Sequence, residues 1–230
     1  MKITYLGNSG FALERDGGIL VIDCYNPAQH PLLSDVSLST MRTVTALISH
    51  SHSDHYSPDI WKLKNARFAA GFDVPAPMGV PKMRPGQTVA PNSLQVTAYG
   101  STDEGVSFHI VWGGVSIFHA GDLNDWHWRD EGGEAYARDA QARFLTELER
   151  IKAGVKNIDL AFFPVDPRMG SDYYRGAILF CQELHPVRLM PMHFGKSFRP
   201  PQQFYEEIAP LTTLLEPPTV EKHMLCPIAR

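Results

Sequence analysis

The sequence predicts a single domain of the α/β class (α+β), which covers residues 1–230. Two patterns indicate this class: many short segments in which apolar and polar residues alternate, and one long segment with helical spacing. A chain of 230 residues that is 43% hydrophobic can bury one large core. The sequence contains no internal repeat and no low-complexity tract that would mark a second domain.

The segments with strand-like alternation are separated by short turns rich in glycine, proline and aspartate. Asp16-Gly17-Gly18 lies between two of them and predicts a hairpin. The run at residues 44–48 is apolar and contains β-branched residues, which is typical of a short buried strand. The segments expected to form strands are residues 2–6, 11–14, 19–23, 44–48, 66–70, 87–90, 93–99, 106–112, 115–120, 158–165 and 187–192.

The longest helix is predicted for residues 134–152. It follows Gly132-Gly133 and stops at Gly154. Its apolar stripe, with a spacing of three to four residues, consists of Tyr136, Ala140, Phe144, Leu148 and Ile151. A helix should begin at Ser57, which is a good N-cap and precedes a proline. The other expected elements are helices over 173–184 and 202–208, irregular segments at 27–40 and 71–85, and an edge strand with a tail at 212–230.

Composition excludes several classes of partner. The net charge is −4 and the pI is about 6.2, so the chain lacks the basic field that nucleic acid requires. No apolar run has the length of a membrane span, and Met1 opens directly onto a strand pattern, so we expect a cytoplasmic protein. Cys24, Cys181 and Cys226 are odd in number and widely spaced, which predicts reduced, buried thiols.

The most informative stretch follows the apolar run at residues 44–48. Within six residues it contains His50, His52, Asp54 and His55. His50 and His52 alternate with serines, so in extended backbone they point to the same side. Mixed nitrogen and oxygen donors suit zinc, manganese or iron better than calcium or magnesium. We favour a metal site over a solvated polar loop, because few folds need this density of ligands.

This H-x-H-x-D-H motif resembles the signature of the metallo-β-lactamase superfamily. Members are mostly dinuclear metal hydrolases with a four-layer αββα sandwich fold, in which the opening strands form one sheet. The spacing is similar to that of the small stand-alone branch of ascorbate-6-phosphate lactonase-like proteins. The resemblance implies that the strands between residues 87 and 120 belong to the second sheet.

The resemblance also implies a ligand set. It assigns His50 and His52 to a first metal site and Asp54 and His55 to a second. His193, which follows a predicted strand, matches the closing ligand of the second site. The remaining match is Asp122, which follows Gly121 at the end of a predicted strand and would bridge both metals.

One ligand of the superfamily pattern is absent. The branch usually has another histidine between the motif and the bridging aspartate, as a ligand of the first site, but this chain has Gly100-Ser101-Thr102-Asp103 there. Either the first site is weak, or Asp103 or His127 replaces the missing imidazole. His109 and His119 are less favoured, because both lie on strands whose geometry directs them elsewhere.

Other residues are expected around the ligands. Trp126 and Trp128 would form either an apolar wall over the metals or an anchor for their own loop. His127 between them would act as a ligand or support one. Asp166 is expected to hold a ligand histidine, and Arg168 to pair with a phosphate or carboxylate of a substrate.

The function implied is that of a metal-dependent hydrolase. Two divalent ions, zinc or else manganese or iron, would activate a hydroxide that Asp54 orients. Its substrate would be a small anionic ester, lactone or phosphoester, with His127, Asp166 or Tyr173 as general acid. The alternatives are a mononuclear or non-catalytic metal-binding or sensor module, and a di-iron redox protein. The sequence is compatible with a homo-oligomer.

Overall fold

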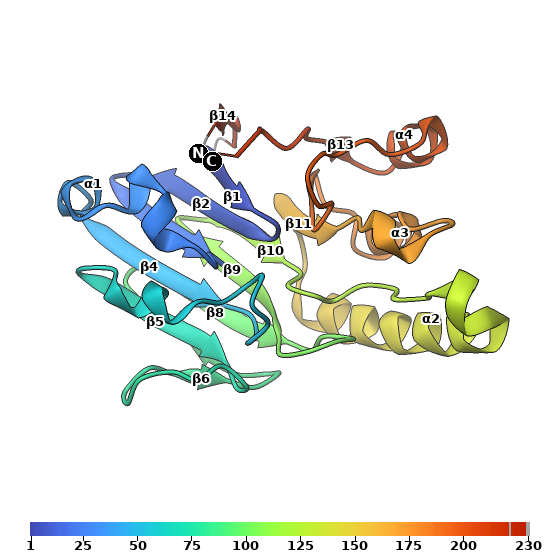
Figure 1. Cartoon of the computed structure of the whole chain (residues 1–230), viewed down its shortest axis with the longest axis horizontal. Coiled ribbons are helices and arrows are strands. Elements are labelled where there is room, and N and C mark those ends of the chain that lie inside the picture. The colour runs from blue at the N-terminus through green and yellow to red at the C-terminus, as the bar shows by residue number, and fades with distance from the viewer. Residues whose placement is uncertain (221, 229–230) are drawn as a thin grey trace.

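Two β-sheets face each other in the computed structural model, which describes residues 1–220 and 222–228 (Figure 1). In these residues each sheet has seven strands. The order in the first sheet is β14 (His223–Leu225), β1 (Lys2–Gly7), β2 (Gly10–Arg15), β3 (Gly18–Ile22), β4 (Thr43–Ile48), β5 (Ala66–Gly71) and β6 (Lys82–Met83). The order in the second sheet is β13 (Thr213–Leu214), β12 (Arg188–Met192), β11 (Leu160–Pro164), β10 (Val115–His119), β9 (Ser107–Trp112), β8 (Leu94–Tyr99) and β7 (Thr88–Val89).

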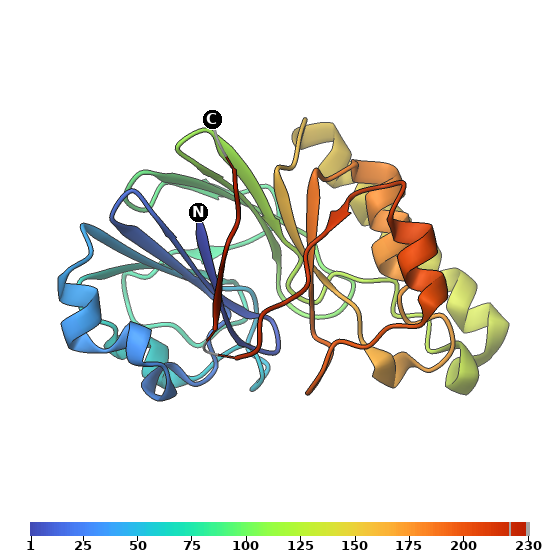
Figure 2. The ribbon, with the colours of Figure 1, turned by 90° about the horizontal axis from the view of Figure 1, so that it is seen from above.

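Helices cover the outer face of each sheet, which confirms the predicted four-layer α/β sandwich (Figure 2). The second sheet is covered by α2 (Arg129–Gly154), α3 (Arg175–Leu184) and α4 (Gln202–Ile208). The first sheet is covered by α1 (Asp35–Ser39) and three 3₁₀ turns, at Pro27–Gln29, Pro31–Leu33 and Pro58–Lys62. No helix of the described residues combines the length and apolar character that crossing a bilayer requires.

The core lies mainly between the sheets and continues under the helices of the second sheet. Phe11 of β2 and Phe162 of β11 meet across the interface, with ring centroids 4.4 Å apart. Phe118 of β10 contacts Phe180 of α3 on the other face, at 5.5 Å. Every residue of β10 and β11 is buried, because both faces of these strands are covered.

Some local predictions were wrong. Residues 27–40 contain the helix α1, where Ser34 is the N-cap and accepts a hydrogen bond from the Ser37 backbone N–H at 3.3 Å. The segment 71–85 includes the short strand β6, and residues 212–230 contribute two edge strands, one to each sheet. Positions 221 and 229–230 of that tail lie outside the described residues.

Helix α2 begins five residues before its predicted start. Gly133, with φ 75° and ψ 178°, interrupts it, so the regular part starts where the sequence indicates. Its buried stripe consists of Ala137, Ala140, Phe144, Leu148 and Ile151. Tyr136, which was expected in that stripe, is instead 43% exposed.

The strand pairing determines where a site can form. β3 and β4 are parallel, as are β10, β11 and β12. The carboxyl ends of parallel strands lie at the same edge of a sheet, and the loops beyond them commonly hold ligands. In this fold the loops from both sheets meet at one rim of the sandwich.

Candidate metal centre

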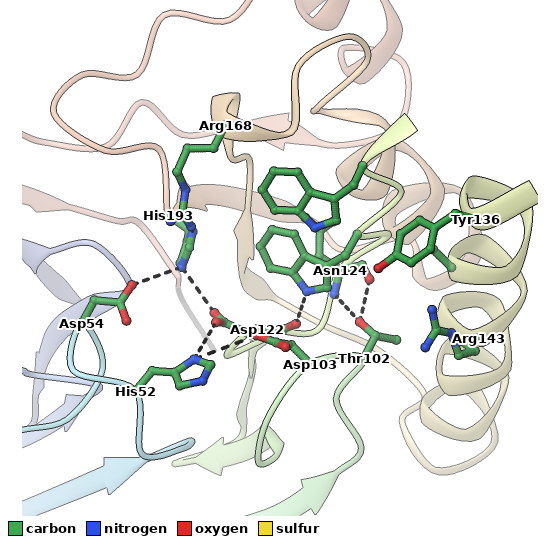
Figure 3. Close-up of a pocket in the computed structure, with 13 residues that line it drawn as sticks. His52, Asp54, Thr102, Asp103, Asp122, Asn124, Tyr136, Arg143, Arg168 and His193 are labelled. Carbon is green, nitrogen blue, oxygen red and sulfur yellow. Dashed lines mark hydrogen bonds and ion pairs between the residues drawn. The ribbon is translucent and has the colours of Figure 1, made fainter. Parts of the chain in front are cut away.

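The rim collects the predicted ligands from three strands. The histidine motif follows β4, Asp122 follows β10 and His193 follows β12. These side chains point toward Asp122, and Figure 3 shows His52, Asp54 and His193 around it. The structure therefore brings together all six residues of the predicted ligand set, His50, His52, Asp54, His55, Asp122 and His193.

One group of donors lies on the Oδ2 side of Asp122. His50 Nε2 is 3.3 Å and His52 Nδ1 is 3.9 Å from that oxygen. Asp103 Oδ2 lies 3.9 Å from His52 Nδ1. His52, Asp103 and Asp122 each offer one atom within 4.8 Å of the others, so this group has the dimensions of a cation site.

The other group lies on the Oδ1 side of Asp122. His55 Nε2 is 3.0 Å and His193 Nε2 is 3.6 Å from Asp122 Oδ1. Asp54 Oδ2 lies 3.5 Å from His193 Nε2. A carboxylate that faces both groups through different oxygens has the position required of a bridging ligand.

The donor atoms fit a cation. Within the described part of the chain, the buried atoms His55 Nε2, Asp122 Oδ1 and His193 Nε2 have no hydrogen-bond partner. Buried polar atoms are nearly always hydrogen-bonded, whereas these three face one another only as ion pairs, an arrangement that fits a bound cation. Two imidazole nitrogens and a carboxylate oxygen are the donors that zinc, manganese and iron accept.

The electrostatic balance of this rim is negative. Burial alone would lower the pKa of His55, but the adjacent Asp122 and Asp23 carboxylates raise it to about 10. Burial acts in the same direction on His193, where the hydrogen bond to Asp166 and the nearby Asp54 carboxylate raise the pKa to about 9. In the metal-free chain the carboxylates thus hold protons on two imidazoles, and a cation would replace those protons.

Asp23 positions two of the histidines. This fully buried carboxylate accepts hydrogen bonds from the Ser49 backbone N–H at 2.7 Å and the Ser49 hydroxyl at 2.6 Å. It also accepts one from His55 Nδ1 at 2.8 Å, which leaves His55 Nε2 free to face the pocket. Because the Ser49 hydroxyl donates to Asp23, it accepts from His50 Nδ1 at 2.8 Å. One carboxylate thereby selects the tautomer of both His50 and His55.

Asp166 performs the same task for His193, as expected. Its Oδ2 accepts from His193 Nδ1 at 3.0 Å and from Arg168 Nη2 at 2.6 Å. Although burial opposes ionisation, these hydrogen bonds lower the pKa of Asp166 to about 2. Asn8 positions the remaining carboxylate, since its Nδ2 donates to Asp54 Oδ2 at 3.0 Å.

Three of these residues have strained backbones. Asn8, Asp23 and His193 adopt φ values of 47°, 47° and 60°. Residues other than glycine rarely occupy this region, and each instance costs about 1 kcal/mol or more. Such conformations persist where the surrounding structure enforces them, and here they direct the side chains toward the rim.

The geometry distinguishes the two candidates for the missing ligand. Asp103 reaches the first group, whereas His127 does not. His127 Nε2 donates to the Asp172 carbonyl at 3.3 Å, and its Nδ1 accepts from the Arg129 backbone N–H at 3.2 Å. Both ring nitrogens are occupied by backbone groups, so this placement argues against the predicted roles of His127 as ligand or acid.

The other histidines are also held elsewhere. His119 Nε2 donates to the Ser9 carbonyl at 2.9 Å, and Gly121 N–H donates to its Nδ1 at 3.2 Å. His109 Nε2 is hydrogen-bonded to the Ser116 hydroxyl at 2.8 Å. Among the residues that the structure describes, neither belongs to a group of potential metal ligands, in agreement with the sequence-based expectation.

A pocket of about 460 Å³ opens above the donor atoms. Trp126 and Trp128 line it with nearly parallel indoles, 6.2 Å apart with an interplanar angle of 12°. Trp126 Nε1 donates to the Asp122 carbonyl at 2.7 Å, and its ring meets His193 edge-on at 5.8 Å. The two tryptophans therefore form a wall beside the cluster, and the Trp126 hydrogen bond also anchors their loop, so both interpretations stay open. Arg168 lies on the same pocket, and Tyr173 is not among its lining residues.

Sequence reasoning missed part of this arrangement. From the sequence alone, Asp23 at the end of its strand fits a residue that faces the site no better than a turn residue, and no role is predicted for Ser49 or Asn8. The position of Asp23 at the end of a strand beside the motif strand was the available signal. Nothing in the sequence marked Asn8 as a supporting residue, because its partner Asp54 lies 46 residues away along the chain.

Comparison with known proteins places the chain in a family. The model of the β-lactamase superfamily domain matches residues 2–134, which is more than half of the chain. A metal-dependent hydrolase of Ignicoccus hospitalis is 26% identical over 235 residues, covering 90% of each chain.

Two solved structures illustrate the shared fold. Igni18, a metallo hydrolase from Ignicoccus hospitalis, matches with a TM-score of 0.67 and 20% identity over 97% of each chain. The di-iron β-hydroxylase CmlA from Streptomyces venezuelae matches with a TM-score of 0.61 and 12% identity, covering 97% of this chain and 53% of that one. The sandwich, the rim and the matched domain agree: the chain belongs to the metallo-β-lactamase superfamily.

Proposed function

We propose that this chain is a hydrolase that uses two divalent cations to cleave an ester, lactone or phosphoester bond in a small anionic molecule. The observation that carries the proposal is the set of unsatisfied buried atoms around Asp122. The similar protein of Ignicoccus hospitalis, named a metal-dependent hydrolase, supports the reaction class. Zinc suits the donor set best, and manganese or iron are the alternatives.

The donor groups assign the ligands. His50, His52 and Asp122 would hold one cation, with Asp103 as its fourth ligand. Asp54, His55 and His193 would hold the other and share Asp122 with the first. Divalent cations at such a site lower the pKa of bound water and polarise a carbonyl or phosphoryl oxygen.

The protein groups then position the reactants. Asp54, held by Asn8, directs a carboxylate into the pocket, where it would orient the attacking water. Asp166 is unsuited to protonate the leaving group, because its pKa of about 2 keeps it ionised at neutral pH. The tryptophan wall limits the access of bulk water on one side of the cluster.

Elemental analysis of the purified chain tests this proposal. We expect about two metal ions per chain, about one in Asp103→Ala, and an unchanged content in His127→Ala, which serves as the control. The parent protein should hydrolyse simple aryl esters or phosphoesters, and a chelator should abolish this activity. One metal ion or none in the parent, even after zinc or manganese is supplied, would refute the dinuclear mechanism and favour a mononuclear or binding module. A visible absorption band with bound iron would favour the redox alternative.

A further inference from the structure

The pocket extends well beyond the donor cluster. One end is formed by His52, Asp54 and His193, and the opposite end lies against α2 (Figure 3). At that end the lining residues from α2 include Tyr136 and Arg143. A molecule bound at the cluster would therefore have room for a second part that reaches the helix.

The tryptophans offer this second part a flat surface. Trp126 is fixed beside the cluster by its hydrogen bond to the Asp122 carbonyl, and Trp128 stacks against it. A ring inserted between two others needs about 7 Å between their planes, since each carbon contact takes about 3.5 Å. The 6.2 Å separation of the indole centroids is too small, so a ligand ring would lie against an exposed face or edge of the pair.

Arg143 gives the helix end a positive charge that remains available to a ligand. Its side chain is 56% exposed, and its guanidinium pairs with Asp139 at 3.2 Å on the helix surface, where the Asp139 side chain is 69% exposed. Exposed pairs of this kind contribute little, so exchange of Asp139 for a ligand anion costs little. Arg168 differs, because its Nε and Nη2 already bind both oxygens of Asp166.

A neighbouring hollow strengthens the case. A second cavity of about 350 Å³ shares Thr102, Asp103 and Arg143 with the main pocket and adds Arg150, which is paired with Glu147 of the same lining. Arg143 thus stands where the two cavities meet. An anionic group held beside the tryptophans can therefore reach this arginine from within the pocket.

We infer that the substrate carries a flat ring and, remote from the bond that is cleaved, a carboxylate or phosphate bound by Arg143. This inference rests on the proposed function for the cleaved bond, whereas the binding site itself does not depend on catalysis. Trp126 and Trp128 receive the ring, and Arg143 is the residue that determines specificity for the anion.

Binding to the full chain as purified tests the inference without catalysis. The probes are 4-nitrobenzoate, 4-nitrophenylphosphonate and the neutral isostere 4-nitrobenzamide, followed by quenching of tryptophan fluorescence. We expect Arg143→Ala to weaken the binding of whichever anion binds the parent more tightly. The expected loss is about tenfold in affinity, as for loss of one charge-assisted hydrogen bond. The amide should bind equally to parent and variant, and Arg138→Ala, on the same helix outside the pocket, should match the parent.

The ring is tested separately. Trp128→Leu should lower the binding affinity for both anions and for the amide alike, by about fivefold or more. The inference is overturned if anions and amide bind the parent equally, or if Arg143→Ala and Arg138→Ala are indistinguishable. The relative affinities of carboxylate and phosphonate identify the preferred anion.

Hydrolysis separates this inference from the proposed function. With 4-acetoxybenzoate as substrate, Arg143→Ala should raise KM about tenfold and change kcat less than twofold, with phenyl acetate unaffected. Metal-dependent hydrolysis with no preference for the anionic ester would sustain the function and overturn the inference. If the anions bind in a way that depends on Arg143 but no ester is hydrolysed, the binding site for the anion is sustained and the proposed function is overturned.

Discussion

Replacement of Asp23 by asparagine should test the logic of the whole centre, because this residue touches no predicted metal. The asparagine is isosteric, and its oxygen still accepts from the Ser49 backbone N–H. Its amide nitrogen must then face the Ser49 hydroxyl and His55 Nδ1, which both donate to Oδ2 in the parent. Two charge-assisted hydrogen bonds are lost, at about 1.5 to 3 kcal/mol each, and part of this loss is offset because no charge is buried. We expect the free energy of unfolding of the metal-free chain to fall by about 3 kcal/mol.

The larger effect should be on metal binding. The amide favours the opposite tautomer of His55, with its proton on Nε2, where the imidazole cannot bind a cation. Loss of a supporting hydrogen bond of this type lowers metal affinity about 10- to 100-fold. Urea unfolding in the presence of a chelator measures the free energy of unfolding of the metal-free chain. Titration with zinc against a competing chelator measures the zinc affinity.

The matched control is Asp159→Asn. Asp159 is also buried and accepts a hydrogen bond from the Ser116 backbone N–H at 2.8 Å, away from the rim. It should lose stability and retain the zinc affinity of the parent. If Asp23→Asn binds zinc as tightly as the parent or the control does, our account of how the histidines are oriented is wrong.

Three further outcomes follow from the geometry. Gly105→Ala should destabilise the chain by about 3 kcal/mol in urea unfolding, because φ is +66° and the new methyl group would collide with the Ser49 carbonyl; an unchanged midpoint would contradict this. Asp166→Asn should weaken zinc binding at the His193 side about 10- to 100-fold, measured by chelator competition, with the metal of the other group retained. Burial raises the pKa of the Cys24 thiol to about 12, so it and the two other buried cysteines should react with Ellman's reagent only after unfolding; rapid reaction of the native chain would count against this burial.

Much of the centre is readable from the chain because its ligands are close in sequence. His50, His52, Asp54 and His55 lie within six residues after one strand, so strand alternation and a turn place them at one point. Asp122 and His193 each follow a strand of the second sheet, and such ends meet at one rim. The fold class follows similarly from local periodicity, which is why most strands were located correctly.

The tertiary structure decided what depends on distant parts of the chain. Asp23 and His55 are 32 residues apart, and only the parallel register of β3 and β4 brings them into contact. The choice of Asp103 over His127 depends on where two loops run, and neither loop has a periodic pattern. Tyr136 was expected in the core because helical spacing allowed it, yet the packed helix buries Ala137 there and Tyr136 lines the pocket. Local sequence therefore predicted the candidate ligands and most strands, while side-chain orientation and pocket shape required the packed fold, because contacts between residues far apart in sequence exist only there.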